Sequence, residues 1–329
     1  MFGKPSPESH SLGLVDLQIN GLYGVDFNQT TVSEEQWRTA RAKLFEDGTT
    51  HFLPTLITDS VDSLCGKLSG LATRCSEEPA REGLASAVGI HLEGPFLSSE
   101  PGYVGAHPRE HAKPLQLDEL KRLVDASKGY LRWVTLAPEC DPAGVGIEYL
   151  TRNGIRVAAG HCNPSMDQLR RAVDHGLGWI THLGNACPAT LPRHDNVLNR
   201  FLAMRGALSA TLIADGHHLP WWLLECWIDC FGEDRVAIVS DAISAAGLPP
   251  GVHRLGDRTV NVGSDGVPRS EDRTHFVGSG ATLGMMRQRC DVEFRWSEER
   301  YQKIFRSNAA GWLGLEASRL DSFPAYPSP

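Results

Sequence analysis

Short apolar runs alternate with longer amphipathic stretches along almost the whole chain. Nearly continuous apolar runs are typical of strands that are buried on both faces of a parallel sheet. We therefore predict eight strands, at residues 14–19, 51–58, 87–92, 131–137, 156–159, 179–182, 208–214 and 236–240.

The segments between these runs have the spacing of amphipathic helices. We predict helices at 33–47, 60–75, 116–127, 166–175, 219–231 and 297–313, and Ser33 with Gln36 has the spacing of a capping box. Eight alternating units favour a closed (β/α)8 barrel of the TIM type over an open doubly wound α/β sheet. The sequence contains neither G-x-G-x-x-G after the first strand nor G-x-x-x-x-G-K-[ST], which weakens the case for a nucleotide-binding fold.

The domain organisation follows from the position of these units. We expect an N-terminal extension at 1–11, the barrel at 12–315 and a proline-interrupted tail at 316–329. A stretch rich in Gly, Asp, Arg and Ser, residues 251–280, is expected to leave the barrel after the eighth strand and to carry a small hairpin near Val260–Val262 and Gly266.

Composition and charge narrow the class of protein. Apolar residues make up 41% of the chain, enough for a large core, and 32 basic against 40 acidic residues give a net charge of −8. Such a surface argues against nucleic acid or an anionic membrane as a partner. The eight cysteines are scattered without a C-x-x-C pair, and no leader or membrane-spanning stretch is found, so we expect a cytoplasmic protein.

Polar side chains stand at the ends of several predicted strands, where the active site of a barrel is built. They are Gln18, Asn20, Glu93, His161, His182 and Asp241. One carboxylate and two imidazoles, from Glu93, His161 and His182, suit a catalytic zinc-type ion with an open position for water. A carboxylate such as Asp241 can then move a proton during hydrolysis of an amide or ester. His91 is expected to point away from Glu93, and a role in packing or in supporting a ligand residue is favoured over a role as a metal ligand.

Several motifs carry a resemblance to a known family. They are VDLQINGLYGVDF (15–27), HLEGPF (91–96), VGAHP (104–108), VTLAPE (134–139), AAGHCN (158–163), THLGNACP (181–188), IADGHH (213–218) and VSDA (239–242). In this combination and order the chain closely resembles the N-acetylglucosamine-6-phosphate deacetylases of the amidohydrolase superfamily. The resemblance covers roughly residues 12–315, and it implies a metal-dependent hydrolase that removes acetate from N-acetyl-D-glucosamine 6-phosphate.

The resemblance also implies roles for individual residues. Glu93, His161 and His182 match the metal ligands, Asp241 matches the catalytic acid and base, and His107 matches a histidine at the acetamide group. The positions that match substrate contacts are Asn185, Ala186, Arg193, His218, Gly278 and Ser279, with Arg193 on the phosphate. His217 replaces His218 in this role if the register is shifted by one residue.

The metal count and the assembly are further expectations. Many amidohydrolases carry H-x-H in the first strand and bind a second ion, whereas this chain has Gln18 and Asn20. We therefore expect one divalent ion per subunit, zinc first, with iron, manganese or cobalt as alternatives. The resemblance implies a homodimer that acts on a small amino-sugar phosphate. The small β-sandwich domain usual in the family is expected to be absent.

Other functions remain open from the sequence. The same chemistry could act on N-acetylgalactosamine 6-phosphate, on an unphosphorylated acetamido sugar or on an N-acyl amino acid. A barrel that binds sugar phosphate without turning it over is a further alternative, although all four of Glu93, His161, His182 and Asp241 are retained.

Overall fold

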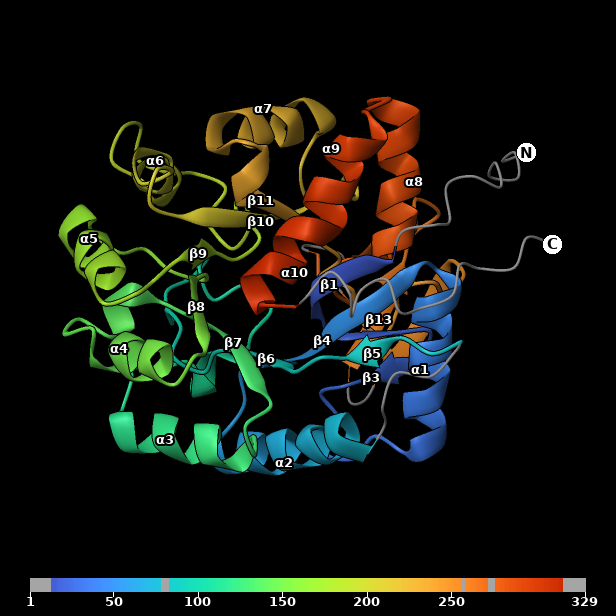
Figure 1. Cartoon of the computed structure of the whole chain (residues 1–329), viewed down its shortest axis with the longest axis horizontal. Helices are drawn as coiled ribbons and strands as arrows, with labels where there is room; N and C mark the ends of the chain where they lie inside the picture. Colours follow the sequence, from blue (N-terminus) through green and yellow to red (C-terminus); the bar gives the residue numbers. More distant parts are fainter. Residues whose placement is uncertain (1–12, 78–82, 256–257, 272–275, 316–329) are drawn as a thin grey trace.

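A barrel of parallel strands forms the centre of the fold, as the sequence predicts (Figure 1). The computed structural model describes residues 13–77, 83–255, 258–271 and 276–315. The predicted extension at 1–11 and the tail at 316–329 lie outside the described residues.

Eight parallel strands follow one another around the barrel in sequence order within the described part of the chain. They are β1 (Leu14–Ile19), β4 (Thr49–Ile57), β6 (Ile90–Glu93), β7 (Leu131–Leu136), β8 (Arg156–Ala159), β9 (Trp179–Ile180), β10 (Ser209–Ile213) and β11 (Val236–Val239). Each predicted run overlaps one of them, so the prediction of the strands is confirmed, although β4 begins two residues earlier and β6 ends one residue later than predicted. The short β5 (Ser86–Ala87) pairs with β4.

The ring closes between β1 and β11 at the C-terminal ends of the strands. The Asp241 N–H donates to the Gln18 carbonyl over 2.9 Å, and the Asn20 N–H donates to the Ala242 carbonyl over 2.7 Å. Below this joint the buried Asp16 carboxylate accepts from the backbone N–H groups of Ser240 (3.1 Å) and Gln18 (3.2 Å). One carboxylate thus fastens the last strand to the first.

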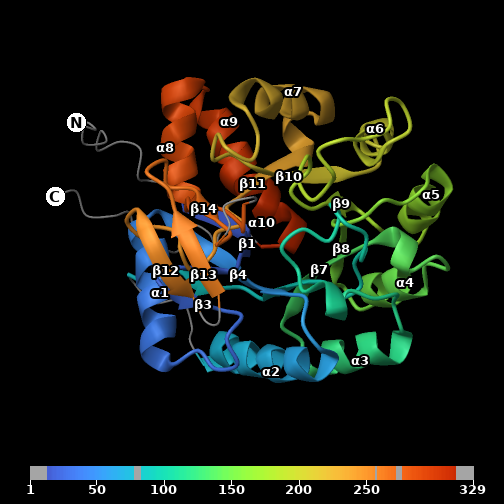
Figure 2. The ribbon, with the colours of Figure 1, turned by 180° about the vertical axis from the view of Figure 1, so that it is seen from behind.

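Helices surround the strands and cover their outer faces (Figures 1 and 2). They are α1 (Glu34–Glu46), α2 (Val61–Glu77), α3 (Leu117–Ala126), α4 (Val145–Arg152), α5 (Met166–Asp174), α6 (Val197–Ala203), α7 (Trp221–Phe231), α8 (Leu283–Glu293), α9 (Glu298–Gln302) and α10 (Asn308–Leu313), with a π-helical turn at Lys303–Ser307 between the last two. Short 3₁₀ turns lie at Arg109–His111, Pro138–Cys140 and Glu233–Arg235.

Local sequence explains where the helices begin. The predicted capping box is present at α1, where the Ser33 hydroxyl accepts from the Gln36 N–H and the Gln36 side chain accepts from the Ser33 N–H. A second capping box, formed by Ser165 and Gln168, begins α5. Among the helices that the structure describes, none has the length and apolar character needed to cross a bilayer.

The predicted excursion after the eighth strand forms a small antiparallel sheet of its own. Its strands are β12 (Gly251–Leu255), β13 (Arg258–Val262) and β14 (Pro268–Arg269), and β13 is the central one. A two-stranded turn, β2 (Gly21–Leu22) with β3 (Val25–Asp26), follows β1. In both views the excursion lies beside α1 (Figures 1 and 2).

The Asp16 joint generates a pH prediction. Burial raises the pKa of Asp16 to about 7. A carboxyl whose pKa is higher in the folded than in the unfolded chain stabilises the fold at acid pH, and this contribution is lost as the pH rises through the folded value. We therefore expect Asp16→Asn to flatten the fall in melting temperature between about pH 4 and pH 7. Circular dichroism melts of both proteins across this range check it, and an unchanged slope contradicts it.

Candidate active site

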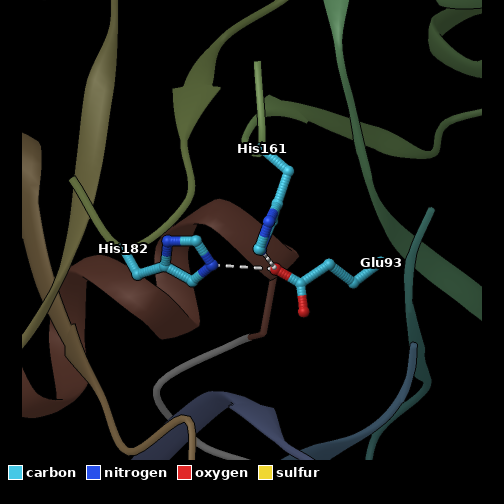
Figure 3. Close-up of side chains that lie close together, drawn as sticks. All are labelled: Glu93, His161 and His182. Carbon is cyan, nitrogen blue, oxygen red and sulfur yellow. Dashed lines mark hydrogen bonds and ion pairs between the residues drawn. The ribbon is translucent and has the colours of Figure 1, made fainter. Parts of the chain in front are cut away.

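Three of the predicted site residues converge at the mouth of the barrel (Figure 3). Glu93 is the last residue of β6, His161 follows β8, and His182 follows β9. The Glu93 Oε1 lies 2.9 Å from Nε2 of His182 and 3.3 Å from Nε2 of His161. All three side chains are buried, and one ligand atom from each lies within 4.8 Å of the others.

The backbone turns sharply at these strand ends. His161, His182 and Asp241 have φ angles of 52°, 34° and 46°, in the left-handed region that residues other than glycine rarely adopt. Each such residue costs on the order of 1–3 kcal/mol, and such strain is concentrated at functional sites. The three strand ends that carry candidate site residues therefore share this uncommon conformation.

One imidazole of the cluster has a fixed proton position. The Nδ1 of His161 lies 2.9 Å from the backbone carbonyl of Tyr103, and a carbonyl can only accept. The Nδ1 therefore carries a proton, and Nε2, on the side of Glu93, is the ring nitrogen that can bind a metal. This is the arrangement that a metal-binding histidine requires.

The charge of Glu93 controls the electrostatics of the cluster. Burial alone would raise the pKa of Glu93, but hydrogen bonds and charge from His161 and His182 outweigh burial and hold this pKa well below its usual range. Burial likewise opposes protonation of His182, yet the Glu93 carboxylate raises the pKa of His182. A buried carboxylate facing two imidazole nitrogens is a donor set that fits a divalent transition metal.

Asp241 lies next to this cluster and is held by two amides. Its Oδ1 accepts from Nδ2 of Asn20 over 2.8 Å and from Nε2 of Gln18 over 3.0 Å. The same Gln18 nitrogen lies 3.1 Å from Oε2 of Glu93 and so bridges the two carboxylates. Burial raises the pKa of Asp241 to about 6, and the charge of Glu93 adds to this effect.

His107 joins the cluster from a loop between β6 and α3. Its ring centroid lies 4.2 Å from that of His161, and its Nε2 lies 3.7 Å from Oε2 of Glu93. The other ring nitrogen, Nδ1, lies 2.8 Å from the hydroxyl of Thr58. The structure therefore brings His107 to the cluster, as expected.

His218 faces Asp215, a residue that the sequence reasoning missed. The Nδ1 of His218 lies 2.7 Å from Oδ2 of Asp215, whose Oδ1 accepts from the N–H groups of His217 and His218. Burial would raise the pKa of Asp215, but the contacts with His218 lower it to about 2. His217 is exposed, so the geometry favours His218 over His217. The position of Asp215 two residues after β10 was the available signal.

The late Gly-Ser pair lies beside Asp241. The Ser279 N–H donates to the Asp241 carbonyl over 3.0 Å, and the Ser279 hydroxyl donates to Oδ2 of Asp215 over 3.3 Å. Gly278 has φ 111°, and a Cβ there would lie 2.5 Å from Cγ2 of Ile243. Ser279 thus links the Asp215–His218 pair to the strand end that carries Asp241.

The remaining predicted contacts divide into two groups. Asn185 and Ala186 line a small cavity together with His161 and Gly184, and Ala186 also has a left-handed φ of 53°. Arg193 is exposed in the loop before α6, and none of the contacts among the described residues joins it to the cluster. Arg200, within α6, donates hydrogen bonds to Asp195 and Asn163.

The expectation for His91 is wrong in direction. Residues two apart on a strand face the same side, so His91 and Glu93 share the inner face of β6. The Nδ1 of His91 donates to the Leu17 carbonyl over 3.0 Å, and its Nε2 lies 2.8 Å from the Thr135 hydroxyl, which lies 2.7 Å from that of Thr181. Burial lowers the pKa of His91 to about 4. His91 is therefore neutral and forms a hydrogen-bonded layer inside the barrel together with Thr135 and Thr181.

The fold and the cluster define the class of the protein, a TIM-type barrel with a candidate metal centre at its C-terminal mouth. No family model matches the chain. It is 35% identical to the human N-acetylglucosamine-6-phosphate deacetylase over 323 residues, which is 93% of this chain and 75% of that protein. It is 33% identical to the Bacillus subtilis protein of the same name, over 83% of this chain and 65% of that one.

An Escherichia coli protein named N-acetylgalactosamine-6-phosphate deacetylase is 32% identical over 73% of this chain and 62% of its own. A crystal structure of the Mycobacterium smegmatis N-acetyl-D-glucosamine-6-phosphate deacetylase superposes with a TM-score of 0.83 and 28% identity, covering 98% of this chain and 85% of that one. The chain belongs to the N-acetylglucosamine-6-phosphate deacetylase family. It spans slightly less than two thirds of the length of the Bacillus subtilis and Escherichia coli relatives.

The donor set predicts that metal binding depends on Glu93. Glu93→Gln removes the negative charge between the two imidazoles, and ligation by carboxylate and imidazole depends on that charge. We therefore expect the purified variant, after metal reconstitution, to retain less than about a tenth of the metal bound by the wild-type protein. Elemental analysis after dialysis measures it. Asp47→Asn is the matched control, because the Asp47 carboxylate accepts from the Gly284 N–H at α8. Equal metal content in Glu93→Gln and wild type would refute the assignment.

Proposed function

We propose that the protein hydrolyses the acetamide of N-acetyl-D-glucosamine 6-phosphate to D-glucosamine 6-phosphate and acetate. The observation that carries the proposal is the buried cluster of Glu93, His161 and His182 with Asp241 beside it, in a barrel of this family. The human and Bacillus subtilis relatives bear the name of this activity.

The proposed cofactor is one divalent metal ion per subunit, with zinc as the first choice. Glu93, His161 and His182 would hold it, because they supply one carboxylate and two imidazoles in a buried setting. A bound ion of this kind polarises the amide carbonyl and makes water a better nucleophile at neutral pH.

Asp241 is the proposed acid and base. Its Oδ1 is engaged by the amides of Gln18 and Asn20, which fixes the carboxylate and assigns the mobile proton to Oδ2. Oδ2 takes a proton from the attacking water and later gives it to the nitrogen of the departing amine. Because the pKa of Asp241 is raised to about 6, the carboxyl can both accept and release a proton near neutral pH.

Other residues are proposed to position the substrate. His107 donates a hydrogen bond to the acetamide oxygen as negative charge develops on it. Asn185, Ala186, His218, Gly278 and Ser279 contact the sugar, and Arg193 contacts the phosphate. A homodimer and a cytoplasmic location stay predictions from the sequence.

A second substrate has support of its own. The Escherichia coli relative named for N-acetylgalactosamine 6-phosphate is almost as similar in sequence as the others. The cluster of Glu93, His161 and His182 addresses the acetamide and is indifferent to the configuration of the sugar, so the galacto isomer is the second candidate. Unphosphorylated acetamido sugars, N-acyl amino acids and binding without turnover rank below it.

The proposal predicts acetate release that depends on Asp241. We expect the metal-reconstituted protein to release one acetate for each D-glucosamine 6-phosphate formed, and Asp241→Asn to lower kcat by about a thousandfold, because general acid and base catalysis contributes on the order of 10²–10⁴. A coupled acetate assay measures both. Absence of turnover on every acetamido sugar phosphate, with metal bound, contradicts the proposal.

The phosphate assignment makes a separate prediction for Arg193. If its guanidinium pairs with the phosphate, Arg193→Ala raises KM for the phosphorylated sugar by about tenfold or more, since a charge-assisted hydrogen bond contributes roughly 1.5–3 kcal/mol. KM for the free sugar stays unchanged. Arg205→Ala is the control because Arg205 bonds only a helix carbonyl, that of Leu202, among its described contacts. An equal change for both sugars would remove Arg193 from the site.

A further inference from the structure

The contacts of Thr58 with His107 indicate where the proton of His107 lies. Thr58 directly follows β4, and its side chain and that of His107 are both buried. The backbone N–H of Thr58 points at Nδ1 of His107 over 3.3 Å, and the Thr58 hydroxyl oxygen lies 2.8 Å from the same nitrogen. One residue therefore contacts the ring nitrogen that faces away from Glu93.

A backbone N–H can only donate a hydrogen bond, so Nδ1 of His107 must accept. A neutral imidazole that accepts at Nδ1 carries its proton on Nε2. The Nε2 lies 3.7 Å from Oε2 of Glu93. An Nε2–H is attracted by that carboxylate, whereas a bare nitrogen lone pair would be repelled by it.

The opposite tautomer has one contact in its favour. The Thr58 hydroxyl could accept from Nδ1–H and donate to the Glu93 carbonyl, which lies 3.5 Å away. In that arrangement the hydrogen bond from the Thr58 hydroxyl to the Glu93 carbonyl is long, and the Thr58 N–H has no acceptor at Nδ1. The lone pair on Nε2 of His107 would also face the Glu93 carboxylate. The geometry favours the first tautomer on all three counts.

We propose that Thr58 is a positioning residue that holds His107 with its proton on Nε2, directed at the place of the acetamide oxygen. The inference rests on the proposed function, in which His107 donates a hydrogen bond to the developing oxyanion. A donor that is aligned before the reaction stabilises this charge without reorganisation. With the proton on Nδ1, His107 would offer a lone pair to an oxygen that is gaining negative charge.

Nuclear magnetic resonance tests the tautomer without substrate. In zinc-reconstituted protein labelled with ¹⁵N-histidine, long-range ¹H–¹⁵N correlations distinguish protonated from unprotonated ring nitrogens, and His107→Gln identifies the signals of His107. We expect a protonated Nε2 and an unprotonated Nδ1. A protonated Nδ1 with an unprotonated Nε2 overturns the proposal.

Kinetics of three variants test the positioning role. Thr58→Val keeps the shape but loses the hydroxyl, and we expect kcat to fall about tenfold while KM changes less than about twofold, because the oxyanion contact is made chiefly in the transition state. Thr58→Ser retains the hydroxyl and should restore most of kcat. Thr50→Val is the matched control. It removes a contact of 2.9 Å between the Thr50 hydroxyl and Nδ1 of His51, near the start of β4, whereas Thr58 directly follows the end of that strand. It should lower stability and leave kcat unchanged.

The outcomes separate this inference from the proposed function. A kcat for Thr58→Val equal to wild type, or a Thr58→Ser as impaired as Thr58→Val, overturns the positioning role. If the wild-type protein releases no acetate from any acetamido sugar, the proposed function fails. The NMR measurement of the His107 ring nitrogens then still decides which tautomer is present.

Discussion

The structure depends on one buried negative charge, the carboxylate of Glu93. An ionised carboxylate is costly to bury unless it is paired, and Glu93 is enclosed at the barrel mouth with His161, His182, His107 and Gln18 around it. The two imidazoles that lower its pKa are the groups that would share a metal ion with it. Gln18, His107, His161 and His182 each direct a side-chain nitrogen toward this carboxylate.

The barrel supplies that aim through strain and through fixed hydrogen bonds. The left-handed backbone at His161, His182 and Asp241 directs the chain toward the mouth of the barrel at three strand ends. Carbonyl and N–H groups, which can only accept or only donate, then set the ring protons: the Tyr103 carbonyl for His161 and the Thr58 N–H for His107. The closure between β1 and β11 places Gln18 within reach of both Glu93 and Asp241.

The repeated strands of the barrel and the residues at their ends could be predicted from the sequence. Individual contacts between residues far apart in the chain could not. Eight buried runs and the rule that barrel sites lie at strand ends were enough to place Glu93, His161, His182 and Asp241 together. Asp215 was missed because a strand-ending Asp looks like an ordinary turn residue until His218 is seen against it. The role of Thr58 needs the loop after β6 to return His107 to β4, which periodicity cannot show. His91 was misplaced because the alternation along β6 was counted wrongly.

The most direct test is a crystal structure of the metal-reconstituted protein, with anomalous diffraction recorded at the absorption edge of the added metal. The account predicts one anomalous peak per chain at about 2.0–2.2 Å from Glu93, His161 and His182, with a position left open toward Asp241. A fully reconstituted protein whose metal lies elsewhere, with Glu93 still paired directly to His182, would contradict it.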